Sequence, residues 1–137
     1  LLNTYKFYAT EGVMHGFKIQ KRHQPLMEVI EFCNTNNIKT AYGGWNTTYI
    51  TTFLSAGSLT VAEYFHDREV RGKILKEKTL ADPEFAVITK IKERTDLYRA
   101  YLENNKIGFK EKQIGIYTIF WNFSGPGPDV DRLRRLI

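Results

Sequence analysis

One segment pattern occurs twice in this chain of 137 residues. The first copy spans residues 17–38 and the second spans residues 88–107, about 70 residues further on. Each copy reads as a basic strand, a short helix, an Asn-rich stop and the beginning of a new strand. A duplicated unit predicts a pseudo-twofold architecture, and such symmetry suits a ligand with a twofold axis of its own, such as duplex DNA.

Length and composition limit the classes of protein to consider. A chain of 137 residues makes one domain, or two small halves that share a core. With 42% hydrophobic and 14% aromatic residues the chain can bury such a core. No apolar run approaches the ~20 residues that span a bilayer, and no signal-peptide pattern opens the chain, so we expect no membrane partner. Cys33 is the single cysteine, which excludes a disulfide framework within the chain and favours an intracellular setting.

The charge of the chain is unevenly distributed. Residues 1–70 contain six Lys/Arg and six Asp/Glu, whereas residues 71–137 contain fourteen and nine and so carry the whole net charge of +5. A pI near 9.3, with basic residues interleaved among aromatic ones, indicates a polyanionic partner. Many ordinary soluble domains are equally basic, so charge alone leaves a second interpretation open.

The local sequence predicts an α+β fold in which each half contains the same unit of strand, helix, hairpin and helix. In the first half we expect a strand over 13–22, a helix from Pro25 to the stop at 34–37, strands over 38–42 and 48–53 joined by a turn at 43–46, and a helix from Ser58 to about His66. In the second half we expect a strand over 85–92, a helix over 97–102 capped by Asp96, a hairpin of strands 107–112 and 114–123, and a terminal helix over 129–137. Residues 82–84 also have the composition of a helix start, which leaves an alternative for the first of these strands.

Each predicted half begins with a segment that has an acidic residue near its end. Residues 4–12 read Thr-Tyr-Lys-Phe-Tyr-Ala-Thr-Glu-Gly, and residues 74–83 read Ile-Leu-Lys-Glu-Lys-Thr-Leu-Ala-Asp-Pro. Together with the order of elements, these segments resemble the motifs of the LAGLIDADG homing endonucleases, whose half-domains each begin with a motif helix. The resemblance implies two similar halves, residues 1–70 and residues 71–137, related by a pseudo-twofold axis.

The resemblance also implies a chemistry. In the homing endonucleases two carboxylates meet at the pseudo-twofold axis and hold Mg²⁺ ions with DNA phosphate oxygens, so that an activated water cleaves the strand. The counterparts in this chain are Glu11 and Asp82, both as catalytic residues and as metal ligands. The lysines that could stabilise the developing charge are Lys18, Lys21, Lys90 and Lys92. The residues themselves leave plainer interpretations open: a solvated acid before a turn for Glu11, and a helix N-cap for Asp82.

DNA recognition is predicted from a separate set of basic and amide side chains. Alternation along strands would place them on one face of a twisted sheet that could enter the major groove. The predicted nucleic-acid-binding residues are Lys18, Gln20, Lys21, Arg22, Lys90, Lys92, Lys110 and Lys112. The alternative is that these side chains simply form the solvated face of a one-sided sheet.

Three classes of function follow from these observations. The first is a DNA-binding domain of homing-endonuclease type, which either cleaves double-stranded DNA with Mg²⁺ or only binds it. The second is a non-enzymatic RNA-binding or splicing-assisting domain on the same scaffold. The third is an unrelated α+β interaction or assembly subunit. In each case we expect a monomer or a homodimer, and the spacing of the three histidines does not match a zinc site.

Overall fold

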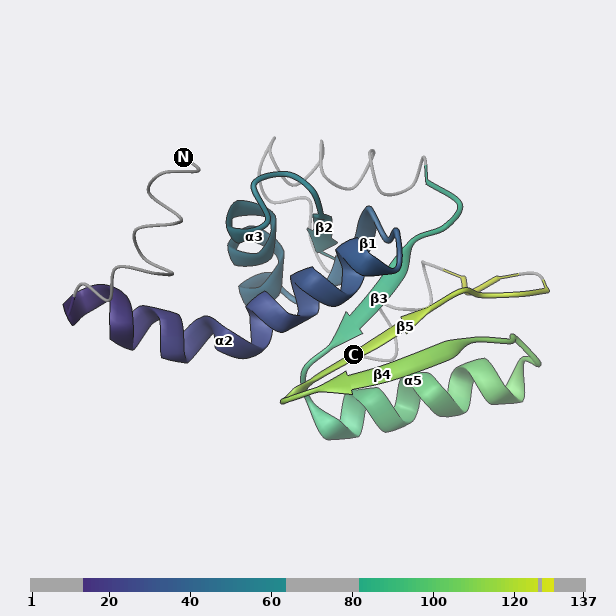
Figure 1. Cartoon of the computed structure of the whole chain (residues 1–137). Coiled ribbons are helices and arrows are strands. Elements are labelled where there is room, and N and C mark those ends of the chain that lie inside the picture. Colours follow the sequence, from purple (N-terminus) through teal and green to yellow (C-terminus); the bar gives the residue numbers. More distant parts are fainter. Residues whose placement is uncertain (1–13, 64–81, 126, 130–137) are drawn as a thin grey trace.

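The computed structural model describes residues 14–63, 82–125 and 127–129 (Figure 1). These residues form three helices and one five-stranded mixed sheet, which confirms the predicted α+β class. The helices are α2 (Met14–Thr35), α3 (Trp45–Leu54) and α5 (Lys92–Asn104). The strands are β1 (Thr40–Gly43), β2 (Thr60–Glu63), β3 (Ala86–Thr89), β4 (Lys110–Ile114) and β5 (Tyr117–Trp121).

One side of the sheet is parallel and the other is antiparallel. The strand order is β2-β1-β3-β5-β4; β1 runs parallel to β2 and β3, and β5 runs antiparallel to β3 and β4. At the centre, Tyr42 of β1 is in register with Ala62 of β2 and with Val87 of β3. Parallel neighbours cannot be joined by a tight turn, so the helix α3 provides the crossover between β1 and β2.

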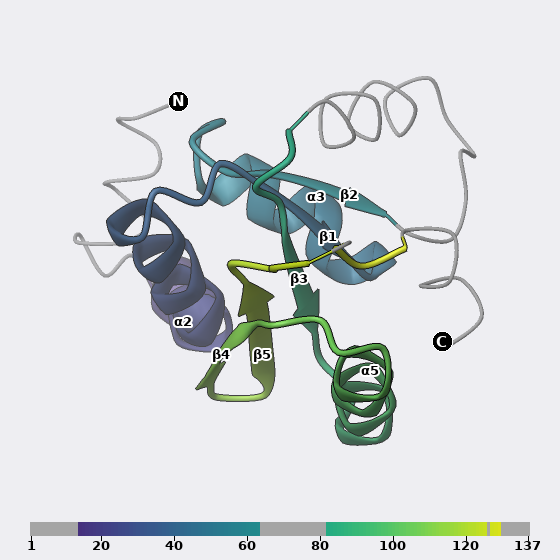
Figure 2. The same ribbon diagram turned by 90° about the vertical axis from the view of Figure 1, so that its right-hand side faces the viewer.

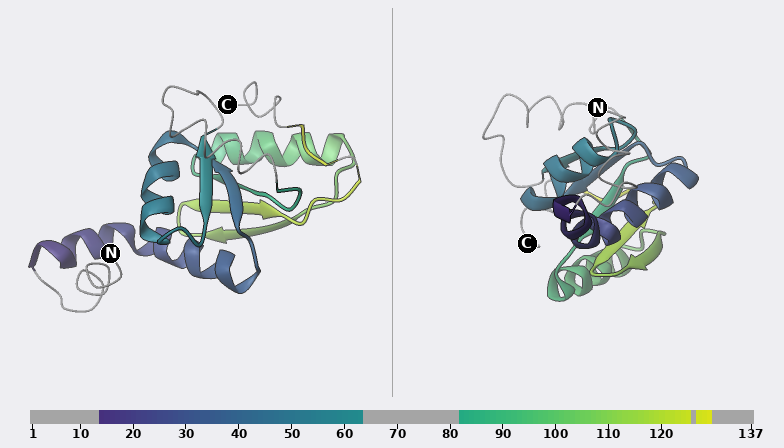
Figure 3. Two further views of the ribbon diagram at one scale, coloured as in Figure 1. Left: turned by 90° about the horizontal axis from the view of Figure 1, so that it is seen from above. Right: turned by 60° about the vertical axis from the view of Figure 1, so that its left-hand side comes forward.

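Helices cover both faces of the sheet. Figure 2 and Figure 3 show α2 against one face and α5 against the other. On the α2 side, Val29 and Cys33 of the helix belong to one apolar cluster with Ala41, Val61, Ala86, Ile88 and Ile119 of the sheet. On the α5 side, Tyr98 and Leu102 of the helix belong to a second cluster with Tyr42, Ala62, Val87 and Phe120. Because successive strand side chains point to opposite faces, β1, β2 and β3 are buried along their whole length.

Helix α3 contains a Thr-rich run that the sequence predicts as a strand. Residues 48–53 are β-branched or aromatic at most positions and favour strands intrinsically, but the parallel connection requires a helix here. Two of the Thr hydroxyls have hydrogen-bond partners, whereas the buried hydroxyl of Thr51 has none among the described residues. Thr48 Oγ1 donates to the Gly44 carbonyl oxygen at 3.0 Å, and the Val61 N–H donates to Thr52 Oγ1 at 3.1 Å. The predicted hairpin over 38–53 is therefore wrong, although its first strand is confirmed as β1.

Two further expectations for the first half are wrong. The predicted strand over 13–22 lies from Met14 onward in α2, which continues through Pro25 instead of beginning there. Pro25 packs against the β4–β5 turn, since a Cβ added to Gly115 would lie 3.1 Å from Pro25 Cβ. The predicted helix over 58–66 contains β2, whose burial on both faces removes the polar alternation typical of a strand. The described first half is thus helix, strand, helix, strand, and two similar halves are not confirmed.

The second half agrees with the prediction in its order of elements. β3 lies within 85–92, α5 contains 97–102, and β4 and β5 form the expected hairpin. Helix α5 begins earlier than expected, at Lys92, with Ile91 as its N-cap, so Asp96 lies inside the helix. Residues 82–84 precede β3 and do not start a helix. The motif segment 4–12, most of the segment 74–83 and nearly all of the predicted terminal helix lie outside the described residues.

Gly43 occupies a tightly packed position at the end of β1. A Cβ added there would lie 2.9 Å from Val61 Cγ1, so Gly43→Ala should lower the free energy of unfolding by about 1–3 kcal/mol through overpacking. Gly44 is the matched control, because it has open space around it and is the N-cap of α3 without a side-chain cap bond. Gly44→Ser should leave stability unchanged or raise it by up to ~1 kcal/mol in urea unfolding. Equal stability of the two variants would contradict this packing.

Candidate functional site

A cleft of about 380 Å³ opens where β3 ends and α5 begins. We name it the lysine cleft. It is lined from the β3–α5 connection, from α5 and from the hairpin by Lys90, Lys92, Thr95, Asp96, Arg99, Gln113, Gly115, Ile116 and Thr118. The cleft therefore combines cationic, amide and hydroxyl side chains with the carboxylate of Asp96 at the N-terminus of a helix.

Local hydrogen bonds hold the entrance to α5 in place. The Thr95 N–H donates to the Ile91 carbonyl oxygen at 2.9 Å, and Thr95 Oγ1 donates to the same oxygen at 3.1 Å. Thr95 Oγ1 also lies 2.6 Å from Thr89 Oγ1, which ties the first turn of α5 to the last residue of β3. The first N–H groups of a helix have no intrahelical partner and carry the positive end of its dipole. Lys90 and Lys92, both exposed, flank this helix end.

Arg99 differs from the two lysines because its charge is already paired. Its guanidinium donates to Glu111 from Nε at 3.0 Å and from Nη2 at 2.8 Å, and to Asp96 from Nη1 at 2.9 Å. The hydrogen bonds to Glu111 raise the Arg99 pKa, so the group stays charged throughout the accessible pH range. Lys90 and Lys92 form no ion pair with any residue that the structure describes. They are the cations in the cleft that can take an anionic ligand.

The other two lysines predicted in the second half lie on a different face. Lys110 and Lys112 are in register with Trp121 and Ile119, which pack on the α2 side of the sheet. Glu111, between them, points to α5 and Arg99. Both lysines are exposed on the edge strand β4, and the structure does not bring them into the lysine cleft.

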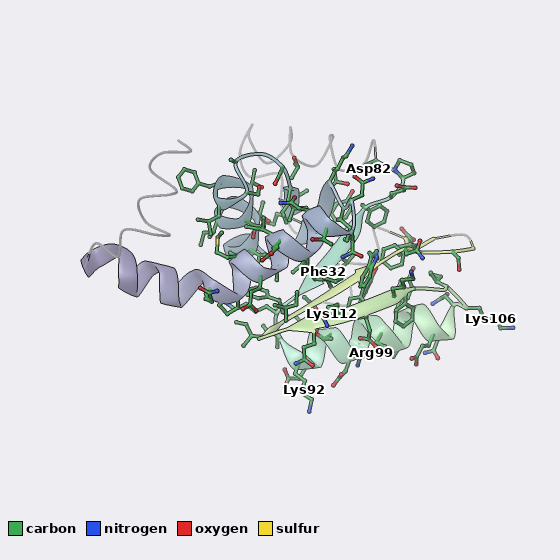
Figure 4. The ribbon with its side chains drawn as sticks, viewed as in Figure 1. Phe32, Asp82, Lys92, Arg99, Lys106 and Lys112 are labelled. Carbon is green, nitrogen blue, oxygen red and sulfur yellow. The ribbon has the colours of Figure 1, made fainter. Side chains whose placement is uncertain are left out.

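Asp82 lies at the opposite end of β3 from Lys92, as Figure 4 shows. Its Oδ2 accepts a hydrogen bond from Thr40 Oγ1 at 2.7 Å and its Oδ1 accepts one from the Glu84 N–H at 2.9 Å. Asp82 is thus an acceptor that joins the start of β1 to the approach to β3, and it is not a helix N-cap. The lysines of the second half that were predicted to assist it are remote from it.

The remaining predicted residues do not test the metal hypothesis. Glu11 lies outside the described residues. Lys18, Gln20, Lys21 and Arg22 lie in α2, where the structure describes their backbone but not their side chains. Among the described residues, no three His, Cys, Asp or Glu side chains are grouped to hold a metal ion. Each oxygen of Asp82 accepts one protein hydrogen bond, and the Mg²⁺ site stays a prediction because its other acid, Glu11, lies outside the described residues.

Sequence reasoning missed the neutral members of the lysine cleft. Gln113 and Thr118 belong to no recognisable sequence motif, and only the observed hairpin turn brings them beside α5.

Residues 82–129 contain seven Lys/Arg and seven Asp/Glu, so this part of the second half is neutral. The excess of positive charge comes from residues 71–81, with +3, and residues 130–137, with +2.

Comparison of the chain with models of protein families, with curated protein sequences and with solved structures finds no match in any of the three. Within the described residues, no helix has both the length and the apolar character needed to cross a membrane.

Cys33 is a core thiol and not a nucleophile. It is fully buried on the sheet-facing side of α2, and burial raises the pKa of the thiol from 9.0 to about 12. As the pH rises, the thiol ionises near pH 9 in the unfolded chain but only near pH 12 in the folded chain. The contribution of Cys33 to the free energy of unfolding is therefore complete below pH 9 and is lost as the pH rises from 9 to 12. At pH 8, iodoacetamide should therefore alkylate the native chain more slowly than the urea-unfolded chain, on the order of 100-fold. Equal rates would contradict the burial of Cys33.

Proposed function

We propose that this chain is a DNA-binding domain that contacts the phosphate backbone of duplex DNA at the lysine cleft. One observation carries the proposal: Lys90 and Lys92, both predicted from the sequence, line the same cleft at the N-terminus of α5. At this place the two ammonium groups, the unpaired N–H groups of the first helical turn and the helix dipole all favour the binding of backbone phosphate groups. Charge-assisted hydrogen bonds of this kind are about twice as strong as neutral ones.

Neighbouring residues support a nucleic acid as the source of the phosphate. Gln113 and Thr118 line the same cleft and can donate hydrogen bonds to phosphate or sugar oxygens. Lys110 and Lys112 lie on β4, a strand of the hairpin that lines the cleft, but on its α2 side, so only a long polyanion that passes around the sheet edge could reach them as well. Because residues 82–129 have no net charge, DNA binding by this part of the chain would depend on the positions of these lysines and not on an overall positive charge.

The first test replaces both cleft lysines by glutamine. Lys90→Gln with Lys92→Gln should weaken binding to a duplex of about 20 base pairs roughly tenfold or more, because two phosphate contacts are lost. The slope of log Kd against log salt should fall by about 1.8, measured by fluorescence anisotropy between about 50 and about 200 mM NaCl. Lys39→Gln with Lys106→Asn is the control, since it removes the same charge away from the cleft and Asn tolerates the positive φ of Lys106.

Three outcomes would contradict the proposal. An equal loss of affinity in the control variant would mean that total charge, and not the cleft, determines binding. Tighter binding to an RNA duplex of the same sequence would favour the RNA-binding class. Self-association that does not depend on salt, without DNA binding, would favour the interaction or assembly class.

The proposal has a second part, which is that the chain consists of two similar halves and cleaves the bound DNA in the presence of Mg²⁺. Both features follow from the homing-endonuclease resemblance and depend on Glu11 together with Asp82. The substrate for the test is the duplex that binds most tightly in a selection from random sequences. Glu11→Gln should abolish its cleavage in Mg²⁺ and leave its Kd unchanged, because a metal-binding carboxylate contributes little to backbone contacts elsewhere. Cleavage that persists in this variant would overturn the catalytic assignment.

A further inference from the structure

A second and larger cleft, of about 750 Å³, lies at the start of the parallel strands. We name it the Asp82 cleft. It lies between the end of α2, the residues that lead into β1 and β2, and the approach to β3, and its polar residues include Asn34, Asn37, Lys39, Thr40, Ser58 and Asp82. We propose that it binds a neutral polyhydroxylated ligand, of the size of a mono- or disaccharide.

The carboxylate of Asp82 is held in a fixed orientation. Thr40, which is buried, donates to Oδ2 at 2.7 Å, and the Glu84 N–H donates to Oδ1 at 2.9 Å. A carboxylate has about four acceptor positions, so each oxygen retains capacity for a ligand hydroxyl group. Asp82 forms no ion pair with a described residue. A preorganised, unneutralised carboxylate is a common anchor for the hydroxyl groups of a ligand.

The rim of the cleft offers further hydrogen-bonding groups. The side chains of Asn34, Asn37 and Ser58 are exposed and have no hydrogen-bond partner among the described residues. The backbone of the two asparagines is fixed by the end of α2: the Ile38 N–H donates to the Cys33 carbonyl oxygen at 2.8 Å, and Asn37 has a φ of 57°. The Ser58 N–H donates to the Ser55 carbonyl oxygen at 3.1 Å. The amides supply both donors and acceptors, as the alternating hydroxyl groups of a sugar require.

Charge and polarity indicate the class of ligand. Asp82 and Lys39 are the charged residues that line the cleft, and their charges cancel. A phosphate or a free cation would leave one of them uncompensated, whereas a neutral polyol satisfies both through hydrogen bonds. Pro83, which is exposed, adds apolar surface that suits the C–H face of a sugar ring, and the volume lies within the usual range for small-ligand sites. The position also separates this cleft from the lysine cleft, at the other end of β3 (Figure 4).

Saturation-transfer NMR on the full chain tests this site with four named probes: methyl α-D-glucopyranoside, methyl α-D-mannopyranoside, maltose and cellobiose. At least one probe should receive saturation from the protein, and Asp82→Asn should weaken its binding about tenfold or more, because a hydrogen bond to a charged acceptor is lost. Glu103→Gln is the matched control: it removes the same charge from the exposed side of α5 and should leave binding unchanged.

Rim variants keep the test decisive if Asp82→Asn also disturbs the fold. Asn34→Ala and Ser58→Ala remove side chains that have no described hydrogen-bond partner, so the fold should persist and binding should weaken severalfold. Binding that is unchanged in both rim variants would overturn the site. The absence of saturation transfer to all four probes, or their displacement by inorganic phosphate alone, would overturn the ligand class.

Discussion

Burial of the central strands on both faces is the constraint on which the rest of this structure depends. Every residue of β1 and of β3 is buried, so neither face of the sheet can be left open to water. The sheet is stable only when α2 and α5 cover the two faces together, and each helix contributes its own apolar cluster. This packing also determines where clefts can form. Both clefts open where a covering helix begins or ends beside strand termini, at Asn34 for α2 and at Lys92 for α5.

The second half could be predicted from the sequence because its signals are local. The hairpin strands β4 and β5 are adjacent in the chain and joined by a short turn at Gly115, whose φ of 59° suits glycine. The first four residues of the edge strand β4 are polar and exposed, as expected for a strand with one unpaired edge. Helix α5 ends at Asn104 as the composition predicts, and only its start was missed, since Ile91 lacks a capping side chain.

The first half could not be predicted in the same way, because its elements are determined by contacts distant in sequence. β2 pairs in parallel with β1 across the whole of α3, and a strand buried on both faces resembles a short apolar helix segment. The Thr-rich run of α3 has strand propensity, yet the crossover requires a helix, and hydrogen bonds such as Val61 N–H to Thr52 Oγ1 make it compatible with the sheet. The two segments of the apparent repeat form different elements: residues 17–35 lie within α2, whereas residues 88–107 contain the end of β3 and the whole of α5.

For the candidate site too, the sequence indicated some of the residues but not their positions in space. Basic residues at 90 and 92 could be selected from the sequence, but their partners in the cleft depend on the hairpin turn. Placement also separates the predicted acid from these lysines. The four residues of β3 lie between Asp82 and Lys90, and a strand of that length spans about 13 Å at 3.3 Å per residue. A metal-bound carboxylate acts on a phosphate oxygen within about 2–3 Å. A phosphate held by the lysine cleft is therefore not the phosphate that Asp82 could help to cleave, and binding and catalysis would require separate contacts along one DNA backbone.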